Sequence, residues 1–327
     1  MSIAMTDEET EQSTIMAEAQ EEVRTMNAQE RRSAEGYWCY NKDNSDPKAI
    51  HAGLYFTCKP WKNDDITRTP HGAFICGSDS LQICSIKVAS IRGGLRWPLQ
   101  VFGMVTVRDV FELNHNHNIV FARARSNCQT IAEEHPYLEL TGPSRAVLIC
   151  FDPGNIEIVL KAKGATESED RDLSFLVLPL STRIYCPYDE DYTSKHSTLK
   201  LTFHHVSKAV QATISVRLIG GSPWPDGFQG VLTASIIRDV EVHLLAFGDD
   251  KLPLVADDGT IKLSRRVVSV RRCDGELKVS ILVAHYDKDE QVAIRDDIVF
   301  TPKGYGTSCG VLNVGARKMQ VTVSWCA

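Results

Sequence analysis

Two tryptophans, each followed by an acidic residue, are the side chains of this sequence best suited to hold a ligand. Trp97 is followed by Asp109, and Trp224 is followed by Asp239. An exposed indole can stack on a base or a sugar, and a carboxylate accepts hydrogen bonds from the edge of a base. These four residues are therefore the candidate ligand-binding residues, and the ligand they suggest is a nucleotide such as an RNA cap.

The same residues also have a structural interpretation, which is the more economical one. Both tryptophans stand in a Gly-Gly-x-x-Trp-Pro pattern, and both acids follow an arginine. In such a pattern the glycines allow a close approach of the backbone, the indole fills the edge of a core and the proline ends a strand. Because adjacent residues on a strand point to opposite faces, each acid would anchor a neighbouring strand or turn. The sequence alone leaves both interpretations open.

No other group of residues predicts a metal site, a cofactor or a catalytic centre. His115 and His117 would share one face of a strand, but two histidines without a third ligand make a poor metal site. A Walker loop and a dinucleotide-binding fingerprint are both missing from the sequence. We therefore expect no metal, no cofactor and no enzymatic activity. Four further residues have separations of 7, 13 and 5, which match no standard zinc finger: His51, Cys58, His71 and Cys76.

The 42 acidic and 36 basic residues are unevenly distributed. Residues 1–36 hold nine acids and three bases, so residues 37–327 hold 33 of each. A neutral body lacks the broad basic field of non-specific nucleic-acid binding, which leaves a cap-like ligand as the one nucleic acid considered. The ten cysteines form no Cys-x-x-Cys pair, which is typical of reduced thiols. With an acidic N-terminus and no long apolar run, we expect a cytoplasmic or nuclear protein without membrane contact.

The elements that must position these residues come in two copies. A Gly-Gly-x-x-Trp-Pro-x-x-x-x-Gly pattern begins at Gly93 and again at Gly220, 127 residues later. Ser144-Arg145 and Ser264-Arg265 repeat in the same order. Self-similarity at this length indicates a duplicated module of domain size.

Apolar residues alternate with polar ones throughout both copies, which is the pattern of half-buried strands. Short runs of this kind between turn formers predict an all-β fold, made of two tandem antiparallel β-sandwich-like modules at 81–190 and 191–327. The polar, turn-rich segment 186–194 is expected to link the modules. Segment 320–324 resembles 211–215, the opening of the second copy, and is expected to complete the second module.

The two modules are expected to superpose, with Trp97 over Trp224 and Gly103 over Gly230. Each short-stranded module would expose an apolar flank, and packing the flanks together would remove them from water. We therefore expect the modules to unfold as one cooperative unit.

The chain before the first module falls into two parts. Residues 1–36 are rich in Glu, Gln, Ala and Met, which predicts an acidic tail that is helical or disordered. A thin apolar stripe suggests that this tail docks on an unknown partner protein. Residues 37–80, rich in aromatic residues, Pro and Asn, are predicted to form an irregular connector.

Longer motifs give the sequence a family resemblance. Examples are Gly93-Gly94-Leu95-x-Trp97-Pro98, Leu140-Thr141-Gly142-Pro143 and Trp224-Pro225-Asp226-Gly227-Phe228. Over roughly residues 81–325 the chain resembles a plant domain of unknown function that is expanded in grasses. A similar domain forms the C-terminal part of the large jasmonate-induced ribosome-inactivating protein of cereals. The resemblance supplies no catalytic residues, and residues 1–80 are too few for the N-glycosidase domain of that protein.

These observations lead to three hypotheses about function. The first is a non-enzymatic binding or regulatory module, which the resemblance links to plant stress or defence. The alternative is recognition of an RNA cap or a nucleotide in translation, carried by Trp97, Trp224, Asp109 and Asp239. The third is an enzyme that acts on ribosomes.

Overall fold

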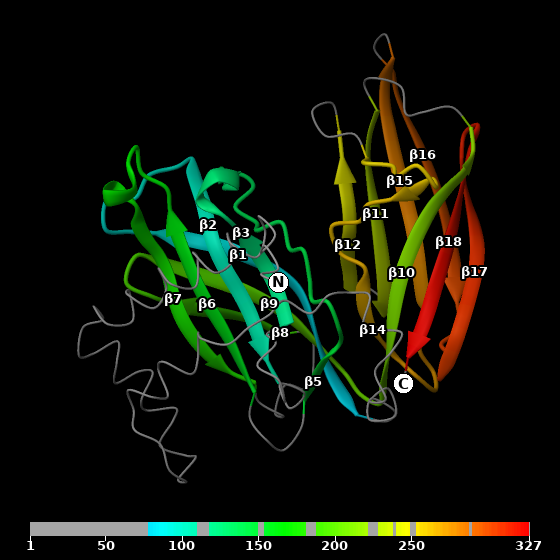
Figure 1. Ribbon diagram of the computed structural model, residues 1–327, viewed down its shortest axis with the longest axis horizontal. Coiled ribbons are helices and arrows are strands. Elements are labelled where there is room, and N and C mark those ends of the chain that lie inside the picture. The colour runs from blue at the N-terminus through cyan, green and yellow to red at the C-terminus, as the bar shows by residue number, and fades with distance from the viewer. Residues whose placement is uncertain are drawn as a thin grey trace, which may run out of the picture.

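β-Strands make up nearly all of the described chain (Figure 1). The computed structural model describes residues 78–109, 118–149, 154–180, 188–221, 228–237, 240–248, 253–287 and 290–326. The helical elements of these ranges are two single turns, η3 (Arg125–Asn127) and η4 (Glu167–Glu169), neither of them able to cross a bilayer. The predicted all-β fold is therefore confirmed. The predicted tail and nearly all of the connector lie outside the described residues.

The first sandwich consists of two antiparallel sheets. Their strand orders are β5-β1-β9-β8 and β3-β2-β6-β7, and β4 pairs with β2 beside β3. The core lies between the sheets because every second residue of a strand is apolar, as in Ile156, Ile158 and Leu160. The strands are β1 (Asp79–Ile91), β2 (Leu99–Arg108), β3 (Asn118–Arg123), β4 (Gln129–Ile131), β5 (Val147–Ile149), β6 (Asn155–Ala162), β7 (Arg171–Pro179), β8 (Tyr188–Thr193) and β9 (Ser197–Val206).

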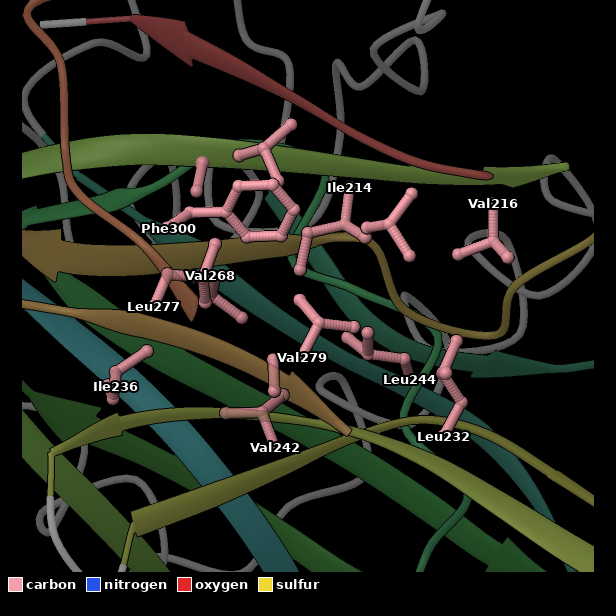
Figure 2. Packing of buried hydrophobic residues seen from close by; sticks show 14 of the residues in the cluster. Ile214, Val216, Leu232, Ile236, Val242, Leu244, Val268, Leu277, Val279 and Phe300 are labelled. Carbon is pink, nitrogen blue, oxygen red and sulfur yellow. The ribbon is translucent and has the colours of Figure 1, made fainter. Parts of the chain in front are cut away.

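The second sandwich repeats this architecture. Its strand orders are β13-β10-β18-β17, with β14 also paired to β10, and β12-β11-β15-β16. Figure 2 shows its core, where Ile214 of one sheet and Val279 and Phe300 of the other lie among the buried side chains. The strands are β10 (Ala209–Gly220), β11 (Phe228–Ile237), β12 (Val240–Phe247), β13 (Thr260–Ile261), β14 (Val267–Arg271), β15 (Leu277–Asp287), β16 (Glu290–Phe300), β17 (Tyr305–Val314) and β18 (Arg317–Cys326).

The two sandwiches share one topology, which confirms the predicted duplication. The order β5-β1-β9-β8 corresponds to β14-β10-β18-β17, and β3-β2-β6-β7 corresponds to β12-β11-β15-β16. Gly103 of β2 lies between the last residue of β3 and Leu160 of β6. Gly230 of β11 lies between the last residue of β12 and Val283 of β15, so the two glycines occupy equivalent places. Trp224 lies outside the described residues.

The sheets place the boundary between the copies later than the sequence pattern did. β8 and β9 pair with each other and, through β9, with β1, so both belong to the first sandwich. The chain enters the second sandwich at the Ser207-Lys208 turn, not at residue 191. The acidic segment around Asp189 is thus an edge strand and not a linker. Charged residues are common on edge strands because they discourage pairing with other chains.

The junction between the sandwiches carries buried polar contacts beside the apolar packing that was expected, in which Val206 of β9 belongs to the second core. Ser80 and Ser269 hydroxyls lie 2.7 Å apart, and the Ser269 amide donates to the Gln82 side chain at 2.9 Å. The Ala146 amide donates to the Gln211 side chain at 2.8 Å. Four of these residues, Ser80, Gln82, Gln211 and Ser269, are buried, and each of these contacts joins the two sandwiches.

A buried arginine completes the junction. Arg265, just before β14, donates to the main-chain oxygens of Ile83 at 2.6 Å and Cys84 at 3.1 Å in β1. Burial lowers the pKa of Arg265 to about 10, and burial raises the pKa of the adjacent Cys84 thiol to about 11. The Cys84 side chain itself packs against the second core. β1 is therefore held by both sandwiches.

Candidate ligand site beside Trp97

A surface depression lies where the end of β1 meets the turn before β2. The turn at residues 92–98 is fastened to the neighbouring β8–β9 connection, since the Arg92 amide donates to the His196 main-chain oxygen at 2.8 Å. Gly93 has φ +67°, and a Cβ there would lie 2.6 Å from the His196 ring. A glycine is needed at this position, because other residues rarely adopt that backbone conformation and would meet the ring.

The other wall of the depression is an extended loop at residues 131–140. The Val88 amide of β1 donates to the Pro136 main-chain oxygen at 2.8 Å, and the Leu138 amide donates to the Ile86 oxygen at 2.9 Å. The loop thus continues the sheet beside β1. Between the loop and the turn lies a space of about 610 Å³. Its lining residues are Lys87, Val88, Ala89, Ser90, Ile91, Leu95, Arg96, Trp97, Glu133 and Pro136.

The Trp97 side chain contacts both the core and the open depression. Its indole is half-buried and packs against the first core, and it also lines the open space. Lys87 and Arg96 bring two positive charges to the same space, and Glu133 brings one negative charge. The Lys87 ammonium lies 5.7 Å from the centre of the Tyr137 ring, a cation–π contact at the rim. An indole with two cations suits a ligand that carries a flat ring and an anionic group.

Asp109 does not belong to this site. It follows β2 and its side chain is fully buried, where it accepts hydrogen bonds from two Arg145 nitrogens at 2.5 and 2.6 Å. Its carboxylate also accepts a bond from the Leu148 amide at 3.1 Å. These bonds tie the end of β2 to β5 in the opposite sheet. The acid anchors a neighbouring strand in the way that the structural interpretation of the Arg-Asp motif describes.

The strand between Trp97 and Asp109 also keeps the two residues apart. β2 spans ten residues, which at about 3.3 Å per residue corresponds to roughly 30 Å. A single nucleotide cannot bridge that distance. Trp224 and Asp239, the other candidate residues, lie outside the described residues.

The described part of the chain contains neither a metal site nor a nucleophile elbow built from the other candidate residues. His115, His117 and the four zinc-finger candidates lie outside it, and within it no three His, Cys, Asp or Glu residues gather as metal ligands. Gly306-Thr307-Ser308-Cys309-Gly310 fits a Gly-x-Ser-x-Gly pattern. It lies within β17, where Ser308 accepts a hydrogen bond from Trp325 at 3.0 Å. A nucleophile elbow needs a sharp strand-to-helix turn, which this paired strand does not make.

Lys87, Arg96 and Glu133 are the site residues that sequence reasoning missed. Comparison of the two copies could have indicated one of these residues, because a residue that differs between the copies is not required by the shared fold. Arg96, beside the indole, has Pro223 as its counterpart, whereas Lys87 has Arg217. Glu133 comes from a loop whose attachment to β1 depends on backbone hydrogen bonds and has no signature in residue types.

Comparison with known proteins identifies a family but no function. A family model described as a domain of unknown function (DUF6598) matches residues 80–323. No curated protein matches the sequence. Solved structures with some likeness include human GIVD cytosolic phospholipase A2, at a TM-score of 0.25 and 10% identity, covering 77% of this chain and 30% of that one. The same enzyme with an inhibitor and terbium chloride gives a TM-score of 0.24 and 10% identity, covering 76% and 32%. The chain spans about a third of the length of these structures, and likeness at this level carries no functional argument.

Proposed function

The chain belongs to the family described as a domain of unknown function (DUF6598), and on this basis we propose that it is a non-enzymatic binding module whose ligand lies beside Trp97. The observation that carries the proposal is the depression in which the half-buried Trp97 indole meets Lys87 and Arg96. Its lining residues include neither a histidine nor a cysteine, and Ser90 is their one hydroxyl group. Such a set of side chains can orient a ligand but offers no nucleophile with an adjacent base.

A nucleotide is the ligand class that these side chains favour. The base would lie against the indole, where stacking contributes about 1–3 kcal/mol per base. Lys87 and Arg96 would hold the phosphates by charge-assisted hydrogen bonds. Glu133 replaces Asp109 as the carboxylate for the edge of the base. In this form of the RNA-cap hypothesis the stacking residue is still Trp97, and the acidic residue is Glu133.

The biological setting that we propose follows from the family resemblance. The resemblance supports a plant protein of the cytosol or nucleus that acts in stress or defence by binding and not by cleaving RNA. Ribosomes incubated with the protein should then keep intact rRNA. Depurinated or cut rRNA would contradict the non-enzymatic part of the proposal.

Fluorescence titration with 7-methylguanosine triphosphate tests the site. The unaltered chain should show quenching that is lost in Trp97→Phe, because Trp97 is the one tryptophan among the residues that line the depression. Arg96→Ala should weaken binding by roughly tenfold, since one charge-assisted hydrogen bond contributes about 1.5–3 kcal/mol.

Arg217→Ala is the matched control, because Arg217 is the second-copy counterpart of Lys87 and lies outside the depression. Its titration should equal that of the unaltered chain. Absence of quenching, or equal quenching in Trp97→Phe, would show that no nucleotide binds beside this indole. If inorganic triphosphate bound as tightly as 7-methylguanosine triphosphate, Lys87 and Arg96 would bind the phosphates without a contribution from the Trp97 indole.

A further inference from the structure

The outer face of sheet β3-β2-β6-β7 carries apolar side chains that are buried although they point away from the core. Phe102 and Met104 of β2 alternate with the core residues Val101 and Val105. Met104 pairs with Val159 of β6 on this outer face. The exposed fractions are 3% for Phe102, 9% for Met104 and 7% for Val159. All three lie outside the core cluster, so something else must cover them.

The described elements do not supply this cover. The sheet β5-β1-β9-β8 lies on the core side of the first sandwich, and the second sandwich contacts the first at β1 and β9. Both of these neighbours therefore lie behind the outer face.

The equivalent face of the second sandwich provides an internal comparison. This face is open to solvent, as expected for a sheet with one wet face. Most of its compared positions are polar, but Val231, the counterpart of Met104, and Val299 also lie on it. Its apolar residues are exposed where those of the first sandwich are buried: Leu282 is 44% and Val299 50% exposed. The equivalent positions, first copy then second, are Phe102 and Gln229, Val159 and Leu282, Phe175 and Arg295, and Val177 and Asp297.

The segment directly before β1 has the composition and the length of a cover. Residues 37–77 are far longer than the undescribed gaps at 110–117, 150–153 and 181–187. At about 3.3 Å per extended residue they can easily pass round a sandwich whose sheets lie ~10 Å apart. Their aromatic residues are Tyr37, Trp38, Tyr40, Tyr55, Phe56, Trp61 and Phe74.

We propose that residues 37–77 dock along the outer face of sheet β3-β2-β6-β7 and bury its apolar side chains with their own. The connector is then a part of the first sandwich and not a spacer. Burial of apolar area on both partners drives the docking, since the face offers no unpaired strand edge for pairing. The second copy has no comparable segment between β9 and β10, and its equivalent face is accordingly open to solvent.

Site-specific photocrosslinking in the full chain tests the docking directly. A benzophenone amino acid at position 175, within the face, should crosslink to peptides from 37–77, identified by mass spectrometry. The same amino acid at position 295, its counterpart in the second copy, should give no crosslink to 37–77. Crosslinks from position 175 to a second chain, to other segments or to nothing would each overturn the proposal.

Limited proteolysis gives an independent readout. Trypsin sites within the segment, such as Lys62 and Arg68, should be cut more slowly than Arg24 in the acidic tail. Phe102→Asp should accelerate the cuts at Lys62 and Arg68 by roughly tenfold or more, because cleavage follows the population of the undocked form. Gln229→Asp, the matched change in the second copy, should leave the cleavage rates unchanged. Equal cutting of segment and tail in the unaltered chain would contradict the docking.

Discussion

At the scale of single residues, Asp109 is an anchor of the fold and not a ligand-binding acid. Its carboxylate is fully buried and accepts bonds from Arg145 and from the Leu148 amide. Removing one partner of a buried ion pair leaves the other charge without compensation and typically costs about 3–5 kcal/mol. Asp109→Ala should therefore lower the free energy of unfolding by about that amount, measured by urea titration.

The exposed pair between Arg271 and Asp274 provides the control for this prediction. Its two atoms lie 3.1 Å apart, yet both side chains are well exposed. Exposed pairs of this kind contribute about 0–1 kcal/mol, so Asp274→Ala should change stability little. A similar loss from both substitutions would show that burial of the Asp109 pair does not set its contribution.

A buried histidine makes the stability of the protein dependent on pH. His204 of β9 is buried, and its ring nitrogens have no hydrogen-bond partner among the described residues. Burial, followed by the charges of His205 and Arg271, lowers its pKa below the usual 6.5. The unfolded chain therefore binds the proton more readily, and the free energy of unfolding should fall as pH drops below about 6.5.

Unfolding titrations across pH 5 to 8 check this dependence. His204→Gln should flatten the curve on its acidic side, while other groups contribute equally to both proteins. His205 is a useful comparison because its ring already faces the Asp79 carboxylate at 2.9 Å. If His205→Gln flattened the curve and His204→Gln did not, the burial of His204 would not be the cause.

Residue types and their spacing could predict one part of the candidate site, the indole, but not the charged residues around it. An indole beside a glycine pair is visible in the sequence, and Trp97 does line the depression. The acid that accompanies it was assigned by order along the chain, and a strand of ten residues separates the two. Lys87 and Glu133 meet Trp97 only through pairing between β1 and a distant loop. Non-local pairing of this kind depends on register and cannot be seen in spacing.

At the scale of elements, period-two alternation predicted the strands because each sheet has one face on a core. Leu277, Val279, Ile281 and Val283 are all buried along β15, as the pattern required. The pattern failed at β8, where acidic residues suggested a linker. An edge strand has one free side, so its residues need not be apolar, and composition cannot separate it from a turn.

The outer faces of the two central sheets show what element-level patterns leave out. Alternation predicts that residues such as Phe102 face outward, and outward residues are normally polar. A buried apolar residue at such a position, such as Phe102 and unlike the exposed Leu282, indicates a further layer. Comparison of the two copies, Phe102 against Gln229, is therefore a better guide to a docked segment than either sequence taken alone.

At the scale of the whole molecule, the duplication produces two cores that share one polar seam. The sheets of each sandwich come from a single copy, so the duplication could be predicted from the repeated motifs, although Val206 and Cys84 of the first copy pack against the second core. The polar contacts between the sandwiches, which form this seam, could not be predicted in the same way. Their residues, such as Gln82, Gln211 and Arg265, are scattered along different strands. Figure 1 shows the two sandwiches lying side by side, and β1 of the first contacts β14 of the second.

This seam should make the two sandwiches unfold together. Its hydrogen bonds are buried, and opening the seam without a replacement partner would cost about 1–3 kcal/mol for each orphaned group. Four such contacts involve Ser80, Gln82, Gln211 and Arg265, so separation is unfavourable for either sandwich alone. In calorimetry the full chain should show one transition, whose calorimetric enthalpy equals the van't Hoff enthalpy.

Hydrogen exchange in the full chain tests this coupling at the level of single strands. Asp109→Ala weakens only the first sandwich directly, because its partners Arg145 and Leu148 lie there. If the seam couples the sandwiches, the slowest amides of β18 in the second sandwich should exchange faster by the same factor as those of β2. Gln82→Leu, which orphans the Ser269 amide, should reduce this transfer and allow two transitions to appear. Unchanged β18 protection in Asp109→Ala would mean that the sandwiches are independent units held together only by the turn at 207–208.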